Sequence, residues 1–66
     1  MKLHINGEIR TFDAPVSVLE VLRAMNLPSQ KIAVELNLEI VPKSAYESQM
    51  VAEGDRIEIV HFIGGG

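Results

Sequence analysis

The residues with the clearest potential for chemistry are the three consecutive glycines at positions 64–66. They follow an apolar alternating run at 57–63, a pattern that is typical of a strand. Glycine has no Cβ atom, so such a segment can adopt backbone angles and enter clefts that any other residue would block. We therefore interpret the Gly66 carboxylate as a reactive group that Gly64 and Gly65 carry into the active site of another protein. The alternative is an inert, frayed terminus.

Other candidates for chemistry are sparse. The chain has no cysteine, which excludes disulfides, thiolate metal sites and cysteine nucleophiles. His4 and His61 lie in predicted first and last strands and would form half of a metal site only if the two strands were neighbours, and the spacing identifies no third ligand. No nucleophile and base stand at a motif spacing. We expect no catalytic residue, no metal and no bound cofactor in this chain.

Size and composition narrow the classes of protein further. A chain of 66 residues with 47% hydrophobic residues predicts one domain with an aliphatic core and no room for a deep catalytic cleft. The net charge is -3 and the six basic residues are scattered, which disfavours nucleic-acid binding. No apolar stretch approaches the roughly 18 residues of a membrane span, and none is typical of a signal peptide. We expect a cytoplasmic protein that does not bind membranes.

Alternation of apolar and polar residues predicts most of the secondary structure. Five strands are expected, at 2–5, 8–12, 32–36, 39–41 and 57–63. Asn6 and Gly7 join the first two strands and both tolerate positive φ, which favours a tight hairpin. Asn37 and Leu38 join the next pair, although leucine is a poor turn residue. The last strand is the most hydrophobic, which favours a place in the middle of the sheet.

One main helix is predicted between the second and third strands, because apolar residues recur there with helical spacing at Val18, Val21, Leu22 and Met25. Ser17 is the expected N-cap, with Glu20 completing a capping box. Pro28 prevents continuation beyond about residue 26. A single helical turn is expected in 43–50, with Ser44 as a possible cap and Tyr46 as a packing residue.

The last strand also predicts a partner interface. If Ile57 and Ile59 face the core, Val60 and Phe62 point the opposite way, because neighbouring strand residues face opposite sides of a sheet. These two side chains would then be exposed beside the glycines. We predict a partner interface at Val60, Phe62 and Ile63, although single exposed apolar residues are common on any protein surface.

The whole chain resembles the ThiS family of sulfur carrier proteins. The resemblance rests on the order of elements, the Asn-Gly hairpin, the opening of the helix at 15–17, the run at 37–43 and the ending at 54–66. It implies an α+β fold of the β-grasp, ubiquitin-like type, with order ββαβββ. A mixed sheet of about five strands would pack on one main helix, with the first and last strands parallel at its centre. The domain would span 1–63, followed by a flexible tail at 64–66.

The resemblance also implies a function in thiamine biosynthesis. An adenylating enzyme (ThiF-like) would use ATP and magnesium to convert the Gly66 carboxylate into an acyl adenylate. A persulfide sulfur donor would then replace AMP and leave a thiocarboxylate, which would deliver its sulfur to thiazole synthase (ThiG-like). The chain itself would catalyse nothing, and we expect it to be a monomer when free. Because the family needs only the final glycine pair, Gly64 would be an extra glycine.

Two alternatives stay open at this point. One is a sulfur carrier of the same fold that serves molybdopterin or another acceptor. The other is a ubiquitin-like module that docks through its sheet without covalent chemistry, and for which the glycine tail would be dispensable.

Overall fold

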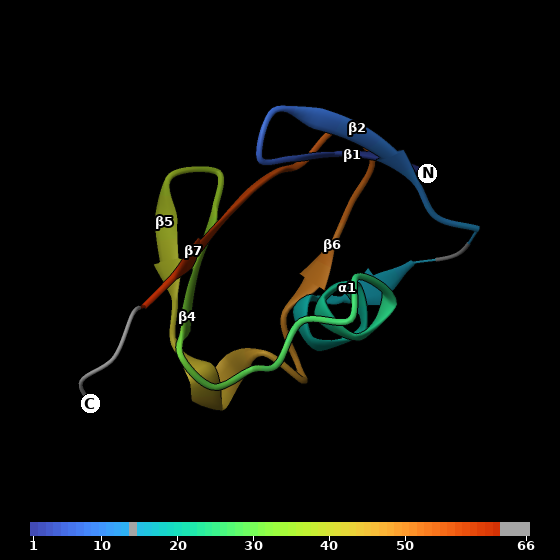
Figure 1. The fold of residues 1–66 in the computed structure, drawn as a ribbon. Helices are drawn as coiled ribbons and strands as arrows, with labels where there is room; N and C mark the ends of the chain where they lie inside the picture. The colour runs from blue at the N-terminus through green and yellow to red at the C-terminus, as the bar shows by residue number, and fades with distance from the viewer. Residues whose placement is uncertain (14, 63–66) are drawn as a thin grey trace.

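The computed structural model describes residues 1–13 and 15–62. Its elements in chain order are β1 (Lys2–Ile5), β2 (Glu8–Thr11), β3 (Val16–Ser17), α1 (Val18–Ala24), β4 (Ile32–Leu36), β5 (Glu39–Val41), the 3-10 turn η1 (Lys43–Ala45), β6 (Met50–Val51) and β7 (Arg56–His61) (Figure 1). All five strands expected from the sequence are present. The two-residue strands β3 and β6 were not predicted.

The five longer strands form one mixed sheet in the order β2-β1-β7-β4-β5. β1 and β7 run parallel, with Ile5 paired to Ile57, and the other neighbours are antiparallel. The sheet curves around α1, which is seen end-on in Figure 1. The predicted α+β, β-grasp fold is therefore confirmed, including the parallel pairing of the first and last strands of this sheet.

Both hairpin turns use left-handed backbone angles. Asn6 and Gly7 have φ of 50° and 83°, as the first turn was predicted to have. Asn37 and Leu38 have φ of 51° and 72°, and leucine in this region is strained. The Asn37 side chain accepts a hydrogen bond from the Arg56 backbone N–H (3.0 Å) and its amide donates to an Asp55 carboxylate oxygen (3.1 Å). Tertiary hydrogen bonds thus hold a turn that leucine alone would disfavour.

The capping box at the start of α1 is confirmed. The Glu20 backbone N–H donates to Ser17 Oγ (3.1 Å), and the Ser17 backbone N–H donates to Glu20 Oε1 (2.8 Å). The other end is a Schellman motif, in which Asn26 has φ of 58° and the Leu27 N–H donates to the Leu22 carbonyl (2.9 Å). Asn26 therefore ends the helix before Pro28 can, a role that the sequence analysis missed.

Ser44 does not cap the turn in 43–50, so that expectation was wrong. The turn begins at Lys43, its N-cap position is Pro42, and no side chain caps it. Ser44 lies inside the turn, two residues after the N-cap position from which a hydroxyl could accept from the first free N–H groups.

The two serines therefore make a matched test of capping. We expect Ser17→Ala to lower the free energy of unfolding by about 1 kcal/mol, because the Glu20 backbone N–H loses the hydroxyl that accepts its hydrogen bond. Ser44→Ala should change it by less than about 0.5 kcal/mol. Urea denaturation followed by circular dichroism would measure both, and equal effects would contradict the assignment of the cap.

β3 and β6 form a small second sheet that ties the start of α1 to the segment before β7. Val16 pairs with Val51, and the Val18 N–H donates to the Gln49 carbonyl (2.9 Å). Strands of two residues have no periodicity for sequence analysis to detect, so only the folded chain reveals them.

The core lies between the concave face of the main sheet and α1. Its buried side chains are Leu3, Ile5, Val18, Val21, Leu22, Ile32, Val34, Val41, Tyr46, Val51, Ile57 and Ile59. Burial raises the pKa of Tyr46, and a smaller, opposite effect comes from a hydrogen bond with the backbone of Val34. The hydroxyl is thus neutral at physiological pH, which agrees with the predicted packing role. In the part of the chain that the structure describes, no helix is long and apolar enough to cross a membrane.

Candidate functional site

The four residues predicted to carry or flank the chemistry, Ile63, Gly64, Gly65 and Gly66, lie outside the described residues. The last described residue before them is Phe62, which follows β7. The site is therefore built from the strand that precedes the glycines and from the surface around it.

β7 is held from both sides in the middle of the sheet. Ile57 and Ile59 are 1% and 6% exposed, which confirms their predicted core orientation. On one side every residue of β4 is paired with a residue of β7. Just beyond the end of β7, the Phe62 N–H donates to the Lys31 carbonyl (2.8 Å). The backbone is thus ordered by hydrogen bonds up to Phe62.

On the other side an asparagine side chain replaces part of a strand. β1 ends at Ile5, opposite Ile57, so it provides no backbone partner for Ile59. Instead Asn6 Oδ1 accepts from the Ile59 N–H (2.7 Å) and Asn6 Nδ2 donates to the Ile59 carbonyl (3.2 Å). We call these two bonds the Asn6 clamp. Sequence analysis assigned Asn6 only to the hairpin turn, and because asparagine suits the turn by itself, no separate signal was present.

The predicted outward orientation of two apolar side chains is confirmed. Val60 is 55% exposed and Phe62 is 54% exposed. Val60 is paired with Ala33 of β4, so the two side chains share the outer face of the sheet, away from α1.

The two histidines do not lie together. The parallel register places His4 beside Arg56, whereas His61 pairs with Ile32 at the other end of β7. Arg56 and His61 are five positions apart, which corresponds to roughly 16 Å along the strand. Within residues 1–13 and 15–62, no group of three or more His, Asp or Glu side chains is placed to hold a metal ion.

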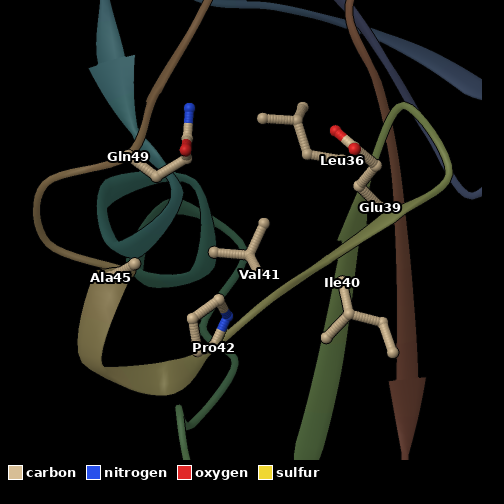
Figure 2. Close-up of a pocket in the computed structure, with 7 residues that line it drawn as sticks. All are labelled: Leu36, Glu39, Ile40, Val41, Pro42, Ala45 and Gln49. Atoms are coloured by element: carbon tan, nitrogen blue, oxygen red, sulfur yellow. The ribbon is translucent and has the colours of Figure 1, made fainter.

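The hollows formed by residues 1–13 and 15–62 do not suggest a small-molecule site. One hollow of about 110 Å³ lies beside β5 and is lined by Leu36, Glu39, Ile40, Val41, Pro42, Ala45 and Gln49 (Figure 2). Two others, of about 300 and 290 Å³, lie beside Tyr46 and beside Leu38. Ligand pockets occupy roughly 300–1,000 Å³ and enclose most of the ligand. The hollow beside β5 has room for a single side chain of a partner.

The sequence of this chain matches a known protein family and proteins of named function. A family model described as the ThiS family matches residues 3–66. A thiazole synthase of Paramagnetospirillum magneticum is 56% identical over the whole chain, and one of Magnetococcus marinus is 39% identical. The chain spans only 20% of the length of each of these two relatives.

Relatives of similar length match as well. The sulfur carrier protein ThiS of Bacillus subtilis is 34% identical over 97% of this chain and 98% of its own length. A crystal structure of the thiamine biosynthesis protein ThiS of Geobacter metallireducens superposes with a TM-score of 0.85 and 35% identity, and the match covers both chains in full.

Proposed function

The chain belongs to the ThiS family, and on this premise we propose that it is a sulfur carrier for thiamine biosynthesis whose Gly66 carboxylate carries the sulfur. The observation that carries the proposal is the match over nearly the full length of a sulfur carrier protein, at both sequence and fold level. In this role the chain is a protein substrate of its partner enzymes and not a catalyst.

The proposed chemistry begins with activation, because a carboxylate resists nucleophiles. A carboxylate oxygen of Gly66 attacks the α-phosphate of ATP, and pyrophosphate leaves to give an acyl adenylate. The terminal sulfur of a persulfide then attacks the acyl carbon, the bond to AMP breaks, and an acyl disulfide forms. A thiol attacks the donor's sulfur and breaks the S–S bond, which leaves a thiocarboxylate on Gly66. Since this chain has no cysteine, that thiol must come from another molecule.

The described part of the chain supports this role by presenting a rigid base for the glycines. β7 is central in the sheet, paired with β4 on one side and held by β1 and the Asn6 clamp on the other. A strand fixed in this way limits the directions from which the residues that follow can leave the domain. Positioning of this kind is what a carrier needs, because its reactive group must meet the active sites of two different enzymes.

The partners follow from the same proposal. Two relatives named thiazole synthase contain a segment that matches this whole chain, which supports a thiazole synthase as the acceptor. The remaining partners, an adenylating enzyme that uses ATP and magnesium and a persulfide donor, are those that the chemistry requires.

The direct test is the intact mass of the protein. The chain is incubated with ATP, magnesium, a ThiF-like adenylating enzyme and a persulfide donor, with a thiol present. We expect a gain equal to the replacement of one oxygen by one sulfur, located in the C-terminal peptide. An unchanged mass, with enzymes shown to load the sulfur carrier of Bacillus subtilis, would contradict the proposal.

We also propose that Val60, Phe62 and Ile63 form part of the surface that binds the adenylating enzyme. Phe62→Asp should weaken this binding about tenfold, roughly 1.4 kcal/mol, because an exposed apolar contact is replaced by a charge. Ile9→Asp on β2 is the matched control, since Ile9 is exposed to a similar extent, 62% against 54%. Calorimetric titration gives both affinities. Equal affinities of the two variants would remove Phe62 from the interface.

A further inference from the structure

The outer face of the sheet pairs two glutamates close to exposed apolar side chains. Glu35 of β4 and Glu58 of β7 are directly paired across the two strands, and both are partly exposed. Side chains paired in this way lie about 5 Å apart at their Cβ atoms. Glu35 and Glu58 are far apart in the sequence and only the pairing of β4 with β7 sets them opposite each other, so the sequence alone did not suggest the pair.

Among the described residues no ion pair compensates the like charges of Glu35 and Glu58. Among residues 1–13 and 15–62 the only ion pair joins Arg10 and Glu8, at the far edge of the sheet (3.8 Å). Arg56 shares the face with Glu58 two residues away, but it forms no ion pair within 4.0 Å with any other described residue. Like charges placed directly opposite in a sheet destabilise it. The arrangement therefore lowers the stability of the free domain.

Exposed apolar side chains frame the pair on both flanks. Ile40 of β5 is paired with Glu35 and is 75% exposed. Figure 2 shows the side chains of Ile40 and Val41 pointing to different sides of β5, and both residues line the hollow beside that strand. Ala33 and Val60 form the next pair on this face, two residues further along the same two strands. We call these six residues the acidic-apolar face: Ala33, Glu35, Ile40, Glu58, Val60 and Phe62.

From this arrangement we infer that the acidic-apolar face docks a protein surface that inserts an arginine between Glu35 and Glu58 and covers the apolar flanks. A guanidinium is planar and has five N–H donors, so one group can bond two carboxylates while its plane packs on apolar side chains. Binding would relieve the repulsion that the free domain retains. This inference rests on the proposed function for the partner, which we take to be the thiazole synthase.

Ordinary surface glutamates have little effect on either stability or binding. Glu35 and Glu58, in contrast, should each lower the stability of the free domain and strengthen the binding of the partner. Glu35→Gln and Glu58→Gln keep the side-chain shape and remove one charge. Each should raise the Tm of the free protein by about 2–4 °C, since the like-charge contact disappears. Each should also weaken binding to thiazole synthase about tenfold, because a charge-assisted bond to the partner is lost.

The control is Glu47→Gln, which changes the net charge equally from an exposed position just after η1. Its Tm and affinity should stay within experimental error of those of the unmodified chain. Increasing salt should raise the Tm of the unmodified chain more than that of either face variant, because salt screens the repulsion between exposed charges.

The experiment is calorimetric titration of a ThiG-like thiazole synthase with each chain, together with thermal unfolding of the free chains. Face variants that bind as tightly as Glu47→Gln, or that have a lower Tm than the unmodified chain, would overturn the inference. Weakened binding to the adenylating enzyme alone would overturn the choice of partner. The mass test on the unmodified chain decides the sulfur-carrier proposal separately. If that chain gains sulfur but the Glu35 and Glu58 variants bind thiazole synthase with unchanged affinity, this inference is rejected and the sulfur-carrier proposal stands.

Discussion

Removal of both Gly65 and Gly66 should abolish sulfur loading and leave the Tm unchanged. Loading is lost because the reactive carboxylate then belongs to Gly64, two residues short of its place in the proposed mechanism, which is roughly 7 Å of extended chain. Stability is retained because, among the residues that the structure describes, the last buried core residue is Ile59, well before the deleted glycines. Intact-mass measurement after incubation with the adenylating enzyme tests the first expectation, and thermal unfolding by circular dichroism tests the second.

Deletion of a single glycine is the informative control. The resulting chain is the same whichever of the three is removed, and it still ends in Gly-Gly. Because the family resemblance requires only a final pair, we expect this shorter chain to load sulfur, and its rate relative to the full chain reports the reach that the third glycine adds. A double-deletion chain that gains sulfur would place the reactive group elsewhere in the molecule.

The second large effect is expected at Asn6. Asn6→Ala should lower the free energy of unfolding by about 2–4 kcal/mol. The N–H and carbonyl of Ile59, which the clamp satisfies, lose their partners at about 1–3 kcal/mol. Alanine at φ of 50° adds about 1 kcal/mol of strain. A domain of this length has only about 3–10 kcal/mol of stability in total, so much of the protein would be unfolded near body temperature.

Two further variants separate the clamp from the turn. Asn6→Gly tolerates the positive φ and removes only the clamp, so it should be less destabilising than alanine by about the strain term. Asn6→Asp keeps an acceptor for the Ile59 N–H but places a carboxylate oxygen against the Ile59 carbonyl. Urea denaturation gives the energies, and hydrogen exchange of the Ile59 amide reports the clamp directly. A glycine variant as stable and as protected as the unmodified chain would show that the clamp contributes nothing.

Several features were predictable because the interactions that specify them are local. The Asn6-Gly7 turn, the Ser17 and Glu20 capping box and the inward orientation of Ile57 follow from neighbouring residues and from a period of two or 3.6. The sequence analysis ended α1 close to the correct residue, but it used only part of the physical reason. Pro28 was the visible signal, whereas the helix ends at the C-cap Met25, and Asn26 in a left-handed conformation follows it and closes the Schellman motif.

The sequence by itself thus determined the main strands, the helix and the outward direction of Val60 and Phe62, and through a family resemblance it indicated the sheet topology and the proposed role of Gly66. Only the tertiary structure decided which distant residues meet. It placed Asn6 on the backbone of Ile59, separated His4 from His61, and set Glu35 against Glu58. Periodicity reports the face on which a side chain lies, but contacts between strands depend on their order and register, and these are set when the whole chain packs around one core.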